Sequence, residues 1–587
     1  MTFAELSVYF QKLETTASRI TMTEILAELF KKVSSDDAGF ISYLLQGRVA
    51  PVFAPIEFGI ADKLMIRAIA LAVNKADEEV TALFKKLGDL GNAAEDLKKR
   101  VPGETLAIKK VFTLLSEIAT AQGAGSQEKK LQLLAQLIKQ VDPLSARYIV
   151  RIPLNKLRLG FSDMTILDSL SWMLTGDKSQ RKAIETAYNV RPDLGFIAGT
   201  LKEKGIAGLK HTKPEPGTPI LMARANRLSS ATEILAKIGR CAIEFKYDGL
   251  RLQVHKKDHK VHMFSRNLED VTPMFPDIAG AVLKQIQARQ VIFEGEVVAY
   301  NPQTGVHVPF QETMQRKRKY DIAAKVLEIP VKLYSFELLF LDHKNYLYEP
   351  YIERKKALKK LIKPGNTIVY AQEEITEDEK AVDRMFDESV ELHFEGIMAK
   401  KLAGVYEAGV RGWNWIKYKK AMNKNLSDTI DVLVMGYTLG EGKRTSFGVG
   451  QFLAGIYDPK QEIFLSVTKV GTGLTDEQFR EFITRTKKLH VSAQPKEYVI
   501  DKLLEPDIWL RPQLVVELGC DEITRSPVHT AGRIMGPSKS GSAQEVKTPG
   551  FALRFPRLER FRDDKTPRDV TTIKEIEGMF EQQGKKR

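Results

Sequence analysis

The sequence predicts a multidomain α+β protein with an all-α N-terminal region, a mixed α/β core and a small C-terminal β-barrel. Three observations lead to this class. First, the chain has 587 residues, which suffice for three or four domains of about 100–200 residues each. Second, apolar residues recur at helical spacing up to a proline-rich segment at 211–219 and alternate after it. Third, short strand-like segments separated by glycine turns follow residue 420.

Helical periodicity extends from residue 3 to residue 209. Apolar residues recur at positions three and four apart, as in 25-ILAELF-30, and this spacing places them on one face of a helix. Prolines and glycines that break helices occur at 51–55, 101–103 and 123–125. We therefore expect a bundle of short helices in a first domain at 1–215.

Strand-like segments alternate with helical ones in the middle of the chain. These segments are 241–255, 290–300, 331–341 and 395–400. Alternation of strands and helices predicts a mixed α/β domain, which we place at 216–420. The extended, proline-rich segment before it marks the boundary.

The last domain, at 421–587, is expected to be β-rich. Its strand-like segments are 429–440, 451–458, 462–471, 514–523 and 550–564. Short strands with glycine turns between them are typical of a small barrel. The polar end of the chain, 579–587, is expected to be frayed.

Composition narrows the class of protein. Lys and Arg exceed Asp and Glu by 89 − 75 = +14, an excess that suits a polyanionic partner but also an ordinary basic protein. Two cysteines exclude a disulfide framework and a cysteine-rich zinc module. No stretch approaches the ~18 apolar residues of a membrane span, and no secretory signal is readable. We expect an intracellular protein that does not contact a membrane.

The most specific local pattern is 246-KYDGLR-251, a lysine at the end of an apolar strand followed by an acid-glycine turn and an arginine. Four fixed positions at background usage would occur here by chance with a probability on the order of 0.004. One interpretation is a hairpin turn at Asp248 and Gly249. The other is a lysine held rigidly at a strand end, where its amine can act as a nucleophile.

Further segments follow in a fixed order: 265-SRNLED-270, 294-EGEVVAY-300, 333-LYSFELLFLD-342, 395-EGIMAK-400, 411-RGWNWIKYKK-420 and 553-LRFPRLERFRDDK-565. Together with 246-KYDGLR-251 this set resembles the nucleotidyltransferase motifs of ATP-dependent DNA ligases of the archaeal and eukaryotic replicative type. Segments 126–138 and 145–170 look like the helical DNA-binding domain of those ligases. The resemblance implies a DNA-binding domain, an adenylation domain and an OB-fold barrel, in that order.

The resemblance assigns the nucleotide-binding residues. Lys246 would attack the α-phosphorus of ATP and carry AMP as a phosphoramidate. Glu244 would accept a hydrogen bond from the adenine or ribose; the alternative for that residue alone is an ordinary exposed strand carboxylate. Arg251 and Arg266 would bind phosphate and ribose. Phe336 would stack on the adenine, whereas its apolar strand by itself favours a core residue.

The same resemblance assigns the groups that would stabilise phosphate charge. Glu296 and Glu395 would hold Mg²⁺ or Mn²⁺ beside the phosphates; two surface acids are the alternative. Lys417 and Lys419 alternate along one strand and would face the phosphates together with Arg411, unless they form a solvated edge.

Three other features complete the expectation. Cationic residues of the terminal motif, which are Arg554, Arg557, Arg560, Arg562 and Lys565, would repel one another without polyphosphate or DNA nearby and would engage pyrophosphate. The basic run 316-RKRK-319 would contact the DNA backbone, or form a solvated loop. A linker at 420–427 would act as a hinge.

The resemblance implies an ATP-dependent DNA ligase that joins a 3′-hydroxyl to a 5′-phosphate at nicks in duplex DNA, in replication, repair and recombination. It would act as a monomer at the nucleoid of a prokaryote or in a eukaryotic nucleus, and a sliding clamp is a candidate partner. The alternatives are an RNA ligase, an mRNA-capping guanylyltransferase, and a non-catalytic DNA-binding scaffold.

Overall fold

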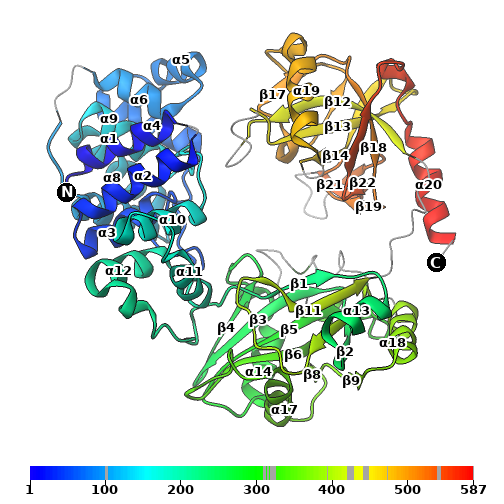
Figure 1. Cartoon of the computed structure of the whole chain (residues 1–587). Coiled ribbons are helices and arrows are strands. Elements are labelled where there is room, and N and C mark those ends of the chain that lie inside the picture. The colour runs from blue at the N-terminus through cyan, green and yellow to red at the C-terminus, as the bar shows by residue number, and fades with distance from the viewer. Residues whose placement is uncertain are drawn as a thin grey trace. The chain divides into compact units, whose positions relative to one another are not determined.

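A computed structural model of the chain describes residues 1–16, 18–99, 103–308, 313, 316, 326–392, 394–419, 429–440, 448–471, 474–537 and 544–585. It separates into two compact units, Met1–Lys420 and Ala421–Arg587, which are described one at a time (Figure 1). Among the described residues, no helix combines the length and the apolar character needed to cross a membrane.

The first part of the chain is helical, as the periodicity predicts. Its helices are α1 (Phe3–Glu14), α2 (Arg19–Lys32), α3 (Ser35–Leu44), α4 (Asp62–Val73), α5 (Asp77–Leu87), α6 (Leu90–Lys98), α7 (Ile108–Thr120), α8 (Ser126–Gln140), α9 (Pro143–Arg151), α10 (Asp163–Thr175), α11 (Arg181–Val190) and α12 (Leu194–Leu209). The expected breaks at 51–55 and 123–125 fall between helices. Val101 and Pro102, in the expected break at 101–103, lie outside the described residues.

Local chemistry explains where these helices begin and how they pack. At the start of α9, the Asp142 carboxylate accepts a hydrogen bond from the Ser145 backbone N–H, and Pro143 occupies the first turn. On α8, Leu131, Leu134 and Ile138 are buried, at the spacing of one helix face. Such faces from many helices meet in one hydrophobic core.

The central part of the chain contains two sheets. The first has the strand order β1-β11-β10-β2-β9 and the second β4-β3-β5-β6-β7, with β8 paired to β6. The strands are β1 (Arg224–Arg227), β2 (Cys241–Lys246), β3 (Leu250–Lys257), β4 (Lys260–Ser265), β5 (Gln290–Ala299), β6 (Val331–Leu341), β7 (Lys344–Asn345), β8 (Ile368–Tyr370), β9 (Glu373–Thr376), β10 (Gly396–Lys401) and β11 (Arg411–Lys419).

Helices cover the outer faces of these two sheets. The helices are α13 (Ala231–Ile238), α14 (Pro276–Gln285), α17 (Tyr351–Leu361) and α18 (Glu379–Glu391). Apolar residues of α13 and α18 pack on β2, β10 and β11, whereas those of α14 and α17 pack on β3, β5 and β6. A third cluster joins the two inner faces and includes Phe336, Tyr406 and Trp415. A cavity lies among the side chains of these inner faces.

The second unit is β-rich, as expected. Its main sheet has the order β15-β17-β12-β13-β14-β16, with β18 paired to both β12 and β23. Two two-stranded sheets, β19-β22 and β20-β21, lie outside it. The strands are β12 (Ile430–Thr438), β13 (Gln451–Asp458), β14 (Ile463–Val470), β15 (His490–Val491), β16 (Tyr498–Val499), β17 (Ile508–Leu510), β18 (Val515–Gly519), β19 (Glu522–Ser526), β20 (Ile534–Pro537), β21 (Gln544–Thr548), β22 (Gly550–Arg554) and β23 (Arg557–Phe561).

The fold class is therefore confirmed as multidomain α+β with a β-rich C-terminal domain, but strand pairing among the described residues does not close into a barrel. Two helices, α19 (Asp476–Thr486) and α20 (Ile573–Lys585), complete the unit. The expectation of a frayed end from 579 is wrong as far as Lys585. Ile576 is fully buried, and the ring of Phe580 contacts that of Phe551 at a centroid distance of 5.4 Å, so an apolar face holds α20 on the sheet.

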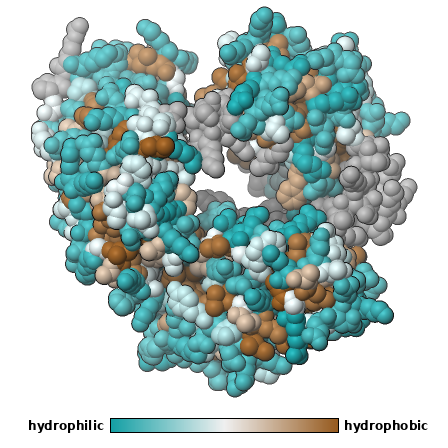
Figure 2. Space-filling model, in the orientation of Figure 1, coloured by the Kyte–Doolittle hydropathy of each residue, from teal (hydrophilic) through white to brown (hydrophobic). Residues whose placement is uncertain are grey.

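The surface visible in Figure 2 is mostly hydrophilic, and both cysteines carry free thiols. Figure 2 shows hydrophilic side chains over most of the visible face, with apolar ones scattered between them, which is ordinary for a folded domain. Both cysteines, Cys241 in the first unit and Cys520 in the second, are free and buried. Burial raises the pKa of each thiol to about 11.

Candidate active site

One cavity of about 410 Å³ between the two central sheets collects every residue that the sequence predicts for the site. Those residues are Glu244, Lys246, Arg251, Arg266, Glu296, Phe336, Glu395, Arg411, Lys417 and Lys419. They come from strands or strand ends far apart in the chain. Strand pairing brings them together: Gly396, beside Glu395, lies opposite both Lys246 and Lys419, and Arg251 lies opposite Glu296.

The turn after Lys246 passes from one sheet to the other. Strand β2 pairs with β9 and β10, whereas β3 pairs with β4 and β5, so the alternative of a hairpin turn at Asp248 and Gly249 is wrong. A Cβ atom at Gly249 would lie 2.1 Å from the carbonyl oxygen of Val297. The glycine of this motif is needed because the backbone of β5 approaches too closely for any side chain.

Lys246 ends β2 and points its amine at a carboxylate. Its Nζ lies 2.5 Å from Oε2 of Glu395, and the Glu395 backbone N–H donates a hydrogen bond of 2.9 Å to the Lys246 carbonyl oxygen. Nζ of Lys419 lies 2.6 Å from the same Oε2. Two ammonium groups thus share one carboxylate oxygen.

The two candidate metal-binding carboxylates of the cavity have pKa values shifted in opposite directions. Burial acts to raise the pKa of Glu395, but the ammonium groups of Lys246 and Lys419 outweigh it and lower the pKa to about 2. Burial raises the pKa of Glu296 to about 7, against the opposing charges of Lys246 and Arg251 and with support from Glu395. Glu296 is therefore the carboxylate whose charge the protein itself compensates least.

The pair of carboxylates fits a hard divalent cation. The described residues contain no group of three or more His, Cys, Asp or Glu side chains placed to hold a metal, so a cage made by the protein is not present there. Glu296 and Glu395 line the same cavity. Mg²⁺ typically binds one or two carboxylates and completes its shell with phosphate oxygens and water. A cation bound there would supply the positive charge that is needed to compensate an ionised Glu296.

Arg251 is held at the cavity wall by buried partners. It donates a hydrogen bond of 2.7 Å to Oε2 of Glu294 and one of 2.8 Å to the carbonyl oxygen of Ala223. Glu294 is fully buried and also accepts hydrogen bonds from Gln253 and Tyr406. Burial alone would lower the pKa of Arg251, but Glu294 raises it above the ordinary value, so the guanidinium stays charged and fixed in orientation.

The remaining predicted cations, Arg266, Arg411 and Lys417, also line the cavity. Burial and the neighbouring charges of Arg251, Arg224 and Arg411 lower the pKa of Arg266. Burial and nearby cations also lower the pKa of Lys417. Within the described part of the chain, none of Arg266, Arg411 and Lys417 forms an ion pair. Repelling cations without carboxylate partners are suited to bind the phosphates of a nucleotide.

Phe336 has both of the properties that the sequence left as alternatives. Its side chain is 9% exposed and belongs to the core cluster between the sheets, yet it also lines the cavity. Its ring lies edge-on to Trp415 at a centroid distance of 6.2 Å, and the Arg251 guanidinium lies 5.5 Å from its centroid. The aromatic rings at this end of the cavity provide a surface on which a planar base can stack.

Glu244 lies at the floor of this apolar end. Its side chain is 2% exposed and is paired with Lys355 and Lys400, so burial, which would raise its pKa, is outweighed and the pKa is lowered. It stays an ionised acceptor.

Sequence reasoning missed three residues of the site. Trp415 and Lys400 line the cavity, and Glu294 holds Arg251. A signal was present for two of them, since Trp415 alternates with Lys417 along β11 and Glu294 alternates with Glu296 along β5.

Two expectations about other basic clusters are corrected. The terminal cations do not need an external polyanion, because each contacts an acid of its own unit: Arg554 with Glu522, Arg557 with Asp521, Arg560 with Glu517, Arg562 with Asp431, and Lys565 with Asp431.

The basic run at 316–319 is only partly described. Arg316 is 1% exposed and forms two hydrogen bonds to the carboxylate of Asp277, of 2.9 and 2.8 Å. It is therefore a structural residue and not a free contact for DNA backbone. Residues 317–319 and the expected hinge at 420–427 lie outside the described residues.

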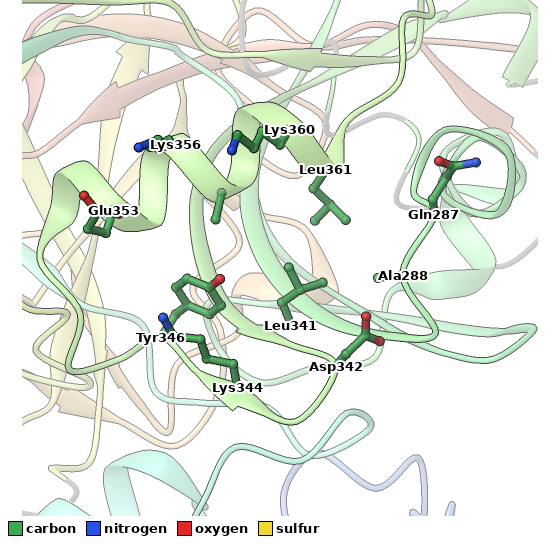
Figure 3. A pocket seen from close by; sticks show the side chains of 11 residues that line it. Gln287, Ala288, Leu341, Asp342, Lys344, Tyr346, Glu353, Lys356, Lys360 and Leu361 are labelled. Carbon is green, nitrogen blue, oxygen red and sulfur yellow. The ribbon is translucent and has the colours of Figure 1, made fainter.

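A second cavity, of about 530 Å³, lies between α17 and the β6-β7 hairpin. Figure 3 shows Lys356 and Lys360 on the helix and Lys344 with Asp342 on the opposite side. None of the predicted site residues lines it. It holds cations and acids together without the nucleophile or the arginines, so the cavity around Lys246 remains the functional candidate.

Comparisons with known proteins agree with this geometry. Three family models match the chain: "DNA ligase N terminus" over residues 2–171, "ATP dependent DNA ligase domain" over 222–419 and "ATP dependent DNA ligase C terminal region" over 445–565. A "Probable DNA ligase" of Dictyoglomus thermophilum is 44% identical, with 100% of this chain and 99% of that protein covered.

More distant relatives agree. A "DNA ligase" of Saccharolobus solfataricus is 38% identical, with 100% of this chain and 98% of that protein covered. A solved structure described as "Pmar-Lig_PreS3" has a TM-score of 0.51 at 18% identity and covers 95% of this chain and 99% of its own, a likeness of fold alone. Identities of 44% and 38% over the whole length, together with the three family models, show that the chain belongs to the ATP-dependent DNA ligase family.

Proposed function

We propose that the protein seals nicks in duplex DNA at the expense of ATP, through an AMP group carried covalently on Lys246. The observation that supports this most directly is the placement of the Lys246 amine in a cavity that is also lined by three carboxylates, four arginines and three further lysines. A strand-end amine beside fixed cations is suited to attack phosphorus and to stabilise the charge that develops there.

Three chemical steps would follow one another at this amine. In the first, the N–P bond forms between Lys246 and the α-phosphorus, and the bond to pyrophosphate breaks. In the second, AMP passes to the 5′-phosphate at the nick and Lys246 is released. In the third, the adjoining 3′-hydroxyl attacks the 5′-phosphate, and AMP leaves.

The chain's own residues would orient and neutralise the nucleotide in the first step. The phosphates would be bound by Arg251, which Glu294 holds in place, and by Arg266 and Lys417. Phe336 would stack on the adenine. Glu296 and Glu395 would hold Mg²⁺ or Mn²⁺, which supplies positive charge to the phosphates when bound.

The other parts of the chain would supply DNA binding. We assign 1–215 to a helical DNA-binding domain, 216–420 to the adenylation domain and 421–587 to an OB-fold domain, with a hinge at 420–427. The proposed setting is replication, repair and recombination at the nucleoid or in the nucleus, by a monomer that a sliding clamp could recruit. Phosphate contacts carry no sequence information, so binding should depend on nick structure.

The alternatives are less favoured. An RNA ligase or capping guanylyltransferase does not account for the match of residues 2–171 to the DNA ligase N terminus. A non-catalytic scaffold does not account for an assembled set of charged residues around Lys246.

The decisive experiment is a labelling and sealing assay. The full chain is incubated with Mg²⁺ and α-labelled ATP, and in parallel with α-labelled GTP, and is then denatured; label that stays on the peptide containing Lys246 is the expected result, with ATP only. Lys246→Ala should lose the label and the sealing of a nicked duplex. Lys257→Ala, at the exposed far end of β3, is the matched control and should keep both. Sealing by a folded Lys246→Ala protein would refute the proposal.

A further inference from the structure

A buried network with balanced charge lies beneath the apolar end of the cavity. It joins two carboxylates, Glu244 and Glu373, to two ammonium groups, Lys355 and Lys400, around the hydroxyl of Tyr351. Lys355 and Lys400 are each 1% exposed. Burying ions is costly unless each is paired and hydrogen-bonded. We therefore look for a role of this network in the cavity that lies next to it.

Glu244 is the centre of the network. Its Oε1 accepts a hydrogen bond of 2.7 Å from Tyr351 and also contacts the Lys355 ammonium. Its Oε2 lies 2.7 Å from Nζ of Lys400. An ionised carboxylate offers about four acceptor sites and no donor, and three of them are engaged. One acceptor site remains on the oxygen that Lys400 holds, and Glu244 is among the residues that line the cavity.

Lys400 links this carboxylate to the aromatic rings of the cavity. Its Nζ donates a hydrogen bond of 3.2 Å to the carbonyl oxygen of Phe336. The same Nζ lies 4.8 Å from the centroid of the Phe336 ring and 4.5 Å from that of Trp415. Lys355 is anchored separately, by a hydrogen bond of 2.8 Å to the carbonyl oxygen of Ala371. Acceptor and rings are therefore held in one fixed arrangement.

We propose that Lys400 and Lys355 are positioning residues that hold Glu244 as a fixed, ionised acceptor, so that the cavity selects a purine with an amino group at position 6. An acceptor without a proton binds the 6-amino group of adenine and repels the 6-oxo group of guanine. The inference rests on the proposed use of ATP and adds the residues that would enforce the choice of base.

The test compares two nucleotides and two forms of the protein. Formation of the labelled enzyme adduct is followed against the concentration of ATP and of purine riboside 5′-triphosphate, which has hydrogen in place of the 6-amino group. For the natural chain, the half-saturating concentration should be about 10- to 100-fold higher for the analogue, the range for a hydrogen bond to a charged group. In Lys400→Met, the requirement for ATP should rise and the difference between the nucleotides should fall to about threefold or less, while the rate at saturation changes little.

Controls separate positioning from general stability. Arg354 is fully buried in an ion pair with Glu337 and does not line the cavity, so Arg354→Met should lower the melting temperature and leave the ratio between the nucleotides unchanged. If Lys400→Met does not fold, Tyr351→Phe, which removes a single donor to Glu244, should still lower the ratio.

The results that overturn the inference are specific. Equal use of the two nucleotides by the natural chain would overturn it, as would an unchanged ratio in folded Lys400→Met or, in its place, in Tyr351→Phe. A natural chain that forms no adduct with ATP would instead refute the proposed function itself, so the two failures are distinguishable.

Discussion

Replacing Phe336 by leucine separates its two properties, because leucine keeps most of the apolar volume and loses the aromatic face. The side chain is 9% exposed in the cluster between the sheets, and an apolar exchange of similar volume typically costs less than about 1.5 kcal/mol. For a domain of this size that corresponds to a fall in Tm of about 5 °C or less. Stacking of a base on an aromatic ring is worth about 1–3 kcal/mol, so the ATP requirement should rise about 5- to 150-fold.

Phe340 provides the matched control. It lies on the same strand, belongs to the same cluster and is 7% exposed, but it does not line the cavity. Adduct formation is measured against ATP concentration for both leucine variants, together with thermal unfolding and the sealing of a nick that already carries AMP. Phe340→Leu should match Phe336→Leu in Tm and match the natural chain in its ATP requirement. If Phe336→Leu keeps its ATP requirement within twofold, the ring is a core residue only and the stacking role is refuted.

Three further predictions follow from other contacts. Arg411→Ala should raise the ATP requirement several-fold yet leave Tm unchanged in a thermal melt, because the side chain is exposed at the start of β11 and has no ion pair among the described residues; a large fall in Tm would contradict this. Gly396→Ala should lower both Tm and adduct formation, because φ is +131° there and the added Cβ would lie 2.3 Å from the Tyr418 carbonyl oxygen; a variant with natural Tm and activity would show that the strand adjusts. Acid should destabilise the first unit partly through His255, whose pKa burial lowers to about 3: the neutral ring accepts a hydrogen bond from the Gly217 N–H, so its contribution is complete above pH 6.5 and is lost as pH falls towards 3. His255→Gln should flatten the loss of stability over that range in melts at several pH values, and an unchanged pH profile would exclude the role.

The residues of the cavity could be predicted because each belongs to a short motif or to one face of a strand. Lys417 and Lys419 follow from alternation along β11, and Lys246 follows from its position at the end of an apolar strand. Their partners could not be predicted in the same way. Glu395 meets Lys246 only because β10 pairs with β2, and pairing between strands about 150 residues apart leaves no local signal.

The partners of the terminal cations could not be predicted from the sequence either. Considered by themselves, Arg562 and Lys565 belong to a dense run of positive charge. In the fold, Asp431, which lies near the start of the unit's sequence, contacts both side chains. It does so because β12 pairs with β18 and β18 pairs with β23. Charge density along a chain therefore overestimates charge density in space wherever strand pairing brings in acids from a distant segment.

The burial of both thiols makes this chain a convenient background for fluorescent labelling. A maleimide dye reacts with thiolate, and Cys241 and Cys520 are inside their units with pKa values of about 11. One new cysteine at an exposed position of each unit would therefore be modified far faster than the native pair. Energy transfer between two such dyes would then test whether the two units move during the reaction, without removal of either natural cysteine.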